Sequence, residues 1–262
     1  LEDVRRKYAE PRRTGIVYGH EVEEYTEETT VDDYAVSVFL SCEGYFKKIT
    51  VQSYRGGSDH KLKEGDEIVQ TVEASNNTDL LFFTDKCQVY KAKAADFSDT
   101  KASVLGEFVA SALQMDKDES AVYMAVTTDY KGYMLFFFEN GKVAKVDMSA
   151  YETKTNRKKL IKAYCDKFPI VAIRHIKEDC EIVMKSSSGR ILLLNTGAVS
   201  PKTTKDTQGV GVMTQRKNHR LESVTDFTEN MFQKPARYRT RTLPAAGSTL
   251  SAEDMGEQLS LI

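Results

Sequence analysis

One short pattern occurs four times along this chain. In each copy an apolar run leads into a turn, and a strand of alternating residues follows the turn. The turns are anchored by Gly44, Cys87, Gly141 and Gly189, which lie 43, 54 and 48 residues apart. Self-similarity at this period is typical of one supersecondary unit copied around a ring or along an array. The repeat therefore constrains the fold more strongly than any single residue does.

Each copy has the composition of β-structure. The apolar runs are 36–40, 80–83, 135–138 and 182–184. Asn140-Gly141 is the strongest hairpin signal, because a tight turn needs a positive φ and Asn-Gly adopts it at little cost. Cys87 stands where the other copies have glycine, which predicts a turn of different construction. The run 135–138 is apolar on both faces, as expected of a sheet packed between two others. We therefore predict an all-β, propeller-like fold, with an ordinary sandwich as the weaker alternative.

Composition narrows the functional classes. No apolar stretch is long enough to span a bilayer and no signal peptide starts at Leu1, so no membrane partner is expected. The four cysteines have neither paired metal spacing nor a disulfide framework, which favours a reducing cytoplasm. The four histidines are scattered. The sequence therefore predicts no catalytic residue, no metal site and no cofactor in this chain.

The chain divides into three parts. Residues 1–30 combine a charged helix end, a proline-broken linker and an acidic connector, and the absence of an initiator methionine suggests a fragment. Residues 31–227 carry the repeats. Residues 228–262 are first basic and then small and polar, which predicts a mostly disordered tail.

Several segments together carry a resemblance to a known family. They are 4–14, the stretches 44–48 and 141–145, the segment 80–90, and 204–210 with its Thr-x-Gly-Val ending. Taken together, they are similar to the C-terminal domain of the A subunit of a bacterial type IIA topoisomerase, meaning DNA gyrase or topoisomerase IV. The match covers about residues 1–227.

The resemblance implies a fold and a setting. The family's domain is a β-pinwheel, a disc of four-stranded blades that exchange strands, whose rim binds and bends duplex DNA. Four blades are clear here; a degenerate fifth from 15–30 with 209–227, or an open disc, are alternatives. The implied parent is an ATP-dependent enzyme whose partners are the ATPase B subunit together with a second A subunit. Its catalytic tyrosine lies outside this chain, and ATP and Mg²⁺ act through the B subunit. The fragment itself is expected to be monomeric and non-catalytic.

Repeated cations predict how the rim contacts DNA, because lysine and arginine at regular intervals neutralise phosphates without reading the sequence. Lys48, Lys91 and Lys145 occupy one place in the repeat, four residues after the anchor, and Leu193 breaks the series. The alternative for any one of them is that it only keeps a strand soluble. The other predicted DNA-binding residues are Lys47, Arg55, Lys61, Lys63, Lys93, Lys142, Arg157, Lys158, Lys159, Lys162, Lys202, Lys205, Arg216 and Lys217.

One loop bears on which enzyme the parent is. Gyrases carry a Gln-Arg-Arg-Gly-Gly-Lys-Gly motif in the first blade, and here only Arg55-Gly56-Gly57 remains, with Asp59 added. This loss favours a topoisomerase IV-like subunit, with a gyrase wrapping domain as the alternative. The net charge of −2 allows only a weak, salt-sensitive DNA contact. A protein–protein interaction propeller is the alternative from another class.

Overall fold

The structure of the protein is a computed structural model, and it describes residues 1–8, 32–54, 59–153, 158–251 and 253–254. The chain forms two compact units, Leu1–Val31 and Asp32–Ile262. In the first unit the described residues form helix α1 (Glu2–Tyr8), which has no buried side chain. The expected linker and connector lie outside the described residues. The second unit contains the repeats.

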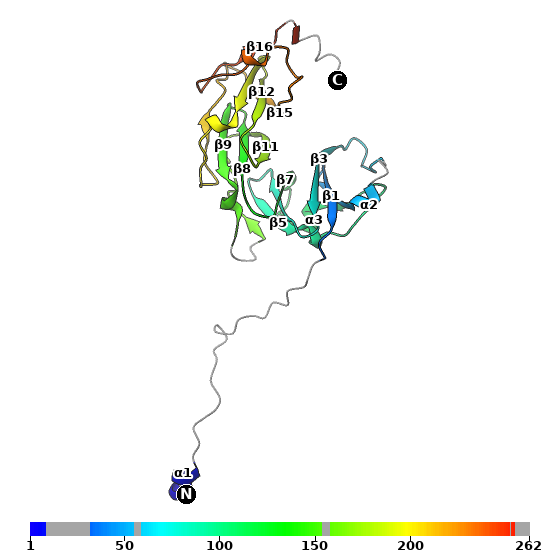
Figure 1. Cartoon of the computed structure of the whole chain (residues 1–262), viewed down its shortest axis with the longest axis vertical. Coiled ribbons are helices and arrows are strands. Elements are labelled where there is room, and N and C mark those ends of the chain that lie inside the picture. Colours follow the sequence, from blue (N-terminus) through cyan, green and yellow to red (C-terminus); the bar gives the residue numbers. More distant parts are fainter. Residues whose placement is uncertain (9–31, 55–58, 154–157, 252, 255–262) are drawn as a thin grey trace. The chain divides into compact units, whose positions relative to one another are not determined.

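The second unit consists of four antiparallel sheets of four strands each, here called blades 1 to 4 (Figure 1). Blade 1 has the order β3 (Ile68–Ser75), β1 (Ala35–Ser41), β2 (Tyr45–Thr50), β6 (Glu107–Phe108). Blade 2 has the order β7 (Ala121–Thr127), β4 (Asp79–Thr84), β5 (Val89–Lys93), β10 (Lys159–Leu160). Blade 3 has the order β11 (Ile170–Ile176), β8 (Tyr133–Phe138), β9 (Lys142–Asp147), β14 (Val210–Gly211). Blade 4 has the order β15 (Leu221–Asp226), β12 (Glu181–Ser186), β13 (Arg190–Asn195), β16 (Ser248–Thr249).

Short helices connect these strands. The α-helical turns are α2 (Val51–Tyr54) and α3 (Val109–Ala112). The 3₁₀ turns are η1 (Ala94–Asp96), η2 (Met148–Tyr151), η3 (Thr196–Ala198) and η4 (Pro235–Arg237). The predicted all-β fold of repeated four-stranded blades is confirmed. Residues 209–227 do not form half of a fifth blade, because they supply β14 of blade 3 and β15 of blade 4. The other half of the suggested fifth blade, 15–30, lies outside the described residues.

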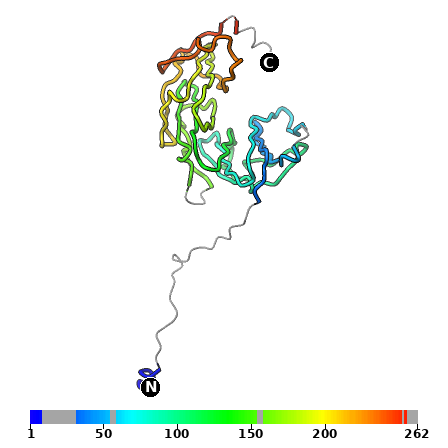
Figure 2. Tube along the Cα trace, viewed as in Figure 1, coloured from blue at the N-terminus to red at the C-terminus, as the bar shows by residue number. Residues whose placement is uncertain are grey.

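The blades exchange strands. The last strand of blades 1 to 3 comes from a segment that follows the next blade's central hairpin: β6 pairs with β2, β10 with β5, and β14 with β9. In blade 4 the last strand, β16, comes from the C-terminal segment and pairs with β13. The opposite edges, β3, β7, β11 and the end of β15, line one shared cavity of about 630 Å³. The exchanged strands therefore form the outer edges, and Figure 2 shows the chain passing from blade to blade in sequence order.

The four repeat anchors occupy equivalent hairpin turns. The N–H of Gly44, Cys87, Gly141 or Gly189 donates to the carbonyl three residues earlier, at 3.0, 3.2, 2.9 and 2.9 Å. All four have a positive φ, between 56° at Cys87 and 81° at Gly44. Gly141 must also lack a side chain, since a Cβ there would lie 1.9 Å from the carbonyl of Met213, which follows β14.

Apolar strands fill the space between neighbouring blades. Phe136 and Phe138 face blade 2, where the Phe136 and Phe83 rings lie 5.7 Å apart. Leu135 and Phe137 on the same strand face blade 4. A fully buried side chain of this size contributes about 1.5–3 kcal/mol relative to an exposed one. The run 135–138 is therefore apolar on both faces because two blades pack against it.

For residues 228–251 and 253–254, the structure corrects the predicted disordered tail; the rest of 228–262 lies outside the described residues. Phe232 and Tyr238 are buried and pack with Leu193 of blade 4, and β16 pairs with β13. Asp254 is 2% exposed and accepts hydrogen bonds from the Gln233 N–H and the Tyr238 hydroxyl. Within the described residues no repeat follows blade 4, and this segment supplies its outer strand. A two-residue strand has too little alternation to be recognised in the sequence.

Candidate nucleic-acid interface

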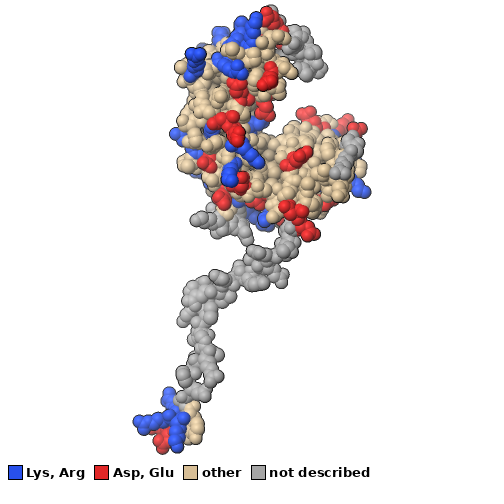
Figure 3. Space-filling view, in the orientation of Figure 1, with Lys and Arg blue, Asp and Glu red and all other residues tan. Residues whose placement is uncertain are grey.

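The outer edges of the blades are built by four exchange segments, whose described residues are 94–108, 148–153 with 158–162, 196–211 and 227–249. They pair with blades 1, 2, 3 and 4 respectively. The first segment is acidic, with Asp96, Asp99 and Glu107 against Lys101. The three later segments have more basic than acidic residues. On the face shown in Figure 3, acidic side chains accordingly gather over blade 1 and basic ones over the C-terminal part of blade 4. The edge that could attract an anion therefore begins at blade 2.

The repeated lysine does not lie on that surface. Lys48 and Lys145, predicted to line a DNA-binding rim, are each only 3% exposed. The Lys48 ammonium donates to Asn76 Oδ1 at 2.7 Å and lies 3.1 Å from Asp99 Oδ1. The Lys145 ammonium lies 2.6 Å from Asp179 Oδ1 and 3.2 Å from the Thr196 carbonyl. A buried charge requires such partners, so the expectation that these two lysines face solvent is wrong.

Lys91, the second member of the series, is half-buried. Its ammonium donates to Thr153 Oγ1 at 3.0 Å and lies 4.8 Å from the centre of the Tyr130 ring. Burial lowers the pKa of Lys91. In all three cases the partners include residues of the next repeat, so the lysines join consecutive repeats.

The break in the series at Leu193 now has a physical reason. Leu193 occupies the same position on β13, but no further repeat follows blade 4 in the described chain. Phe232 and Tyr238 of the last exchange segment pack there instead. These apolar partners favour leucine at position 193, whereas the polar partners at the equivalent positions of the other blades favour lysine.

Lys47 is also buried, with 1% exposure, and is a second correction to the predicted rim. Its ammonium donates to the carbonyls of Lys61 at 2.7 Å and Ala102 at 3.2 Å. Burial lowers the pKa of Lys47. This side chain therefore ties the loop after α2 to the first exchange segment. Arg55, from the same loop, lies outside the described residues.

The remaining predicted residues fall into two groups. Exposed ones are Lys61, Lys63, Lys93, Lys158, Lys162, Lys202, Arg216 and Lys217. Half-buried ones are Lys142, Lys159 and Lys205. Lys142 lies 5.0 Å from the centre of the Phe168 ring, and Lys205 donates to the Ala150 carbonyl at 3.3 Å. Arg157 lies outside the described residues. Lys158, Lys162 and Lys202 are thus exposed on the outer edges of the blades. Lys142, Lys159 and Lys205 are partly covered by neighbouring residues.

Sequence reasoning missed cations of the last exchange segment. Lys234, Arg237 and Arg241 are exposed there. Arg239 makes two hydrogen bonds to the Glu181 carboxylate, at 2.7 and 2.8 Å, and so fastens the segment to blade 4. The basic composition of 232–241 could have indicated these cations, but the expectation of a disordered tail left them out of the predicted DNA-binding residues.

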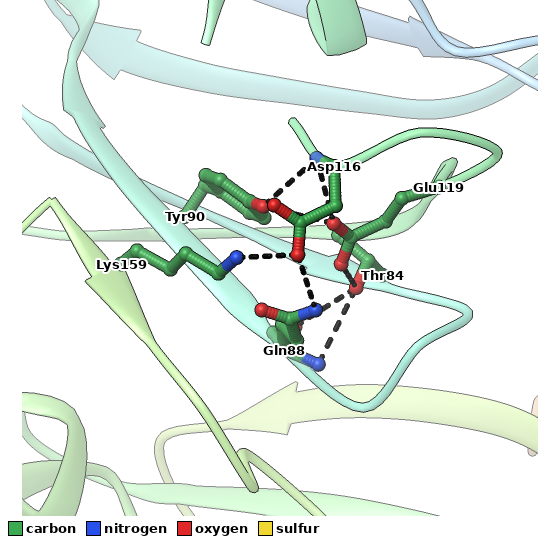
Figure 4. Close-up of polar contacts among 6 residues, drawn as sticks. All are labelled: Thr84, Gln88, Tyr90, Asp116, Glu119 and Lys159. Carbon is green, nitrogen blue, oxygen red and sulfur yellow. Dashed lines mark hydrogen bonds and ion pairs between the residues drawn. The ribbon is translucent and has the colours of Figure 1, made fainter. Parts of the chain in front are cut away.

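A polar cluster fixes the position of β10 on blade 2 (Figure 4). The Lys159 ammonium donates to Asp116 Oδ2 at 2.6 Å, and this hydrogen bond lowers the pKa of Asp116. Gln88 Nε2 donates to the same oxygen at 3.2 Å. The Tyr90 hydroxyl donates to Glu119, a buried carboxylate, at 2.8 Å. Lys159 is therefore neutralised where it lies and positions the exchange segment that carries the exposed Lys158 and Lys162.

The amino-acid sequence of the chain was compared with those of known proteins. No family model matches the chain. It is 26% identical over 209 residues to the A subunit of DNA gyrase from Mycoplasma pneumoniae, a match covering 77% of this chain and 25% of that protein. It is 26% identical over 165 residues to the A subunit of DNA topoisomerase 4 from Bacillus subtilis, covering 62% and 20%. The chain is a homologue of these topoisomerase A subunits. It spans about a quarter or less of their length.

Solved structures agree with the blade architecture. The C-terminal domain of DNA topoisomerase IV matches with a TM-score of 0.65 and 23% identity, covering 77% of this chain and 64% of that one. The DNA gyrase A C-terminal domain matches with a TM-score of 0.56 and 17% identity, covering 81% and 76%. The fold is therefore that of the topoisomerase pinwheel domains, as the sequence predicted.

The described residues offer little for other chemistry. Within them, no three or more His, Cys, Asp or Glu side chains are grouped so as to hold a metal ion. No helix in the same residues combines the length and apolarity needed to cross a bilayer. What the described surface does offer is exposed cations on the outer edges of blades 2 to 4.

Proposed function

We propose that this chain is the non-catalytic DNA-binding and DNA-bending domain of an ATP-dependent type IIA topoisomerase A subunit. The observation that supports this most directly is the placement of exposed cations on three successive exchange segments, represented by Lys158, Lys202 and Arg237. Cations at intervals along an outer edge attract the phosphate backbone and release its counterions. Such contacts position a duplex without reading its sequence.

The proposed contact is weak and sensitive to salt. The chain has a net charge of −2, its first exchange segment is acidic, and several predicted rim lysines are engaged inside the fold. Fewer free cations mean fewer phosphates neutralised. Since strong wrapping needs many phosphate contacts, this balance favours a topoisomerase IV-like subunit over a gyrase.

The parent enzyme is also a proposal. By homology, the complete protein pairs with ATPase B subunits in addition to a second A subunit, in the cytoplasm of a bacterium. The nucleophilic tyrosine belongs to the missing catalytic core, while ATP and Mg²⁺ belong to the B subunit. This domain then acts by holding and bending DNA beside the catalytic core.

A salt titration tests the central claim. The affinity of the domain for a duplex of mixed sequence is measured by fluorescence anisotropy from low to physiological salt. We expect log affinity to fall linearly with log salt, with a slope of about −0.9 for each phosphate contacted. Duplexes of unrelated sequence are expected to bind equally. No binding at low salt would reject the proposal and favour a protein-binding propeller.

A topology assay separates the two candidate parents. The intact enzyme, with and without this domain, is incubated with relaxed and with interlinked circular DNA in the presence of ATP. Decatenation and relaxation alone are expected for a topoisomerase IV-like enzyme. Introduction of negative supercoils that depends on this domain would instead identify a gyrase.

A further inference from the structure

A pocket of about 390 Å³ lies where three repeats meet at the outer side of blades 2 and 3. The β4–β5 turn contributes Lys86 and Cys87 to it. The chain after β10 contributes Lys162 and residues 164–167, and the next exchange segment contributes Asp206 and Gln208. The volume is in the range of clefts that hold small ligands, about 300–1,000 Å³.

The charged groups of this pocket leave it positive. Lys86, Lys162 and Lys167 are exposed, and none of them forms an ion pair with another described residue. The only acidic side chains among the described residues of its lining are Asp166 and Asp206. The lysines of the inter-repeat series lie beside acids or polar groups, whereas these three remain available to an external anion.

The backbone of the pocket departs from the repeat. Cys87 has a φ of 56° and Lys162 a φ of 53°, both in the left-handed region that non-glycine residues seldom adopt. The other three anchors are glycine, and at Gly141 the Met213 carbonyl occupies the place a side chain would need. In blade 2 the Cys87 side chain fills that place, and its Sγ lies 4.0 Å from the Cys165 carbonyl oxygen. Strained residues of this kind persist where surrounding structure holds them, and they concentrate at binding sites.

We propose that this pocket binds a phosphodiester group of duplex DNA. The proposal rests on the proposed function and deepens it, because it assigns one phosphate position to Lys86, Lys162 and Lys167. Lysine ammonium groups bind phosphate as point charges from several directions, and no planar fork is needed. Lys158 and Lys202, exposed on the exchange segments that also build this pocket, extend the positive edge beside it. Asp166 and Asp206 keep the contact weak.

Lysine footprinting tests the assignment on the unaltered protein. The domain is acetylated briefly with and without saturating duplex DNA at low salt, and modification of each lysine is quantified by mass spectrometry. We expect DNA to slow acetylation of Lys86, Lys162 and Lys167 several-fold. Lys131 and Lys177, exposed in the β7–β8 and β11–β12 turns, should react equally with and without DNA. Equal rates at the three pocket lysines in a DNA-bound sample would overturn the proposal.

A matched pair of triple variants gives a second readout. Replacing Lys86, Lys162 and Lys167 by alanine should weaken DNA binding several-fold and flatten the salt dependence by roughly one unit for each phosphate that is no longer neutralised. Replacing Lys101, Lys131 and Lys177 removes the same charge elsewhere and should leave the slope unchanged. Lys162→Gly removes the ammonium and suits the left-handed backbone, so it tests the charge with less backbone strain than Lys162→Ala. Thermal melting checks that this variant is folded.

The outcomes separate this proposal from the function on which it rests. If the wild-type domain does not bind duplex DNA, the proposed function fails and the pocket assignment fails with it. If the wild type binds but both triple variants bind alike, the function stands and only the pocket is rejected. Protection of all three lysines together with a flatter slope supports both.

Discussion

The ammonium of Lys145 and the carboxylate of Asp179 lie 2.6 Å apart across the boundary between blade 3 and the fourth repeat. Lys145 is on β9, and Asp179 is in the turn between β11 and β12. The lysine is 3% exposed and the aspartate 43% exposed, so the pair closes over one end of the interface. Lys48 and Asp99 form a comparable pair between blade 1 and the next repeat.

Removing one partner of this pair should destabilise the domain. Asp179→Asn leaves the buried Lys145 charge without a carboxylate partner, although the Thr196 carbonyl and the Tyr133 ring remain. We expect a loss of about 1–3 kcal/mol, reduced by the partial exposure of Asp179. Urea denaturation followed by circular dichroism measures this. Lys131→Ala, which removes an 80% exposed lysine, is the control and should change stability by less than about 0.5 kcal/mol. Equal effects of the two changes would contradict the assigned role.

The same pair predicts a pH dependence. The hydrogen bond from Lys145 lowers the pKa of Asp179 below its unfolded value of about 3.9. The folded state therefore binds a proton less readily than the unfolded state. This contribution is complete above the unfolded pKa and is lost as the pH falls through the folded pKa. Stability measured from about pH 6 down to about pH 3 should fall less steeply for Asp179→Asn than for the wild type.

The C-terminal segment should be required for stability. Truncation after residue 242 removes β16 and the Asp254 carboxylate that accepts from Tyr238, and so uncovers the outer edge of blade 4. We expect a clear fall in melting temperature. Tyr238→Ala should cost about 3–5 kcal/mol, as for other large buried aromatic residues. Truncation after residue 254 is the matched control, and a loss there as large as after 242 would argue against this assignment.

Exposed and buried lysines should behave differently in DNA binding. Replacing Lys158, Lys202 and Lys217 together by alanine should lower affinity and flatten the salt dependence, with little change in unfolding. Replacing Lys48, Lys91 and Lys145 together should instead lower the melting temperature strongly, because each joins two repeats. Both variants are tested by thermal melting and by anisotropy. A stably folded variant of the second set with weakened binding would favour the rim predicted from the sequence.

The degenerate first-blade loop shows how residue type and position can mislead. Lys63 ends the loop compared above with the gyrase motif, and Lys47 lies before that loop on β2. In the structure Lys47 holds two backbone carbonyls, and Lys63 lies 4.7 Å from the centre of the Tyr45 ring and 3.6 Å from Glu43. The sequence pattern around a lysine on an alternating strand is the same whether the side chain faces solvent or a neighbouring repeat. Only the groups that the folded chain places around the ammonium, such as the two carbonyls at Lys47, decide between the two.

The sequence by itself determined the blades, because hairpin turns and apolar runs are local. The positive φ at Gly141 and the two apolar faces of 135–138 follow from residues close together in the chain. Which lysines are buried, and what covers the last blade, depended on tertiary structure. Lys145 meets Asp179 from the following repeat, and Leu193 meets Tyr238 from the final segment. These contacts join residues that are far apart in the chain, because later segments fold back against β9 and β13, and the two-residue strands of the exchange segments carry no pattern that reveals this.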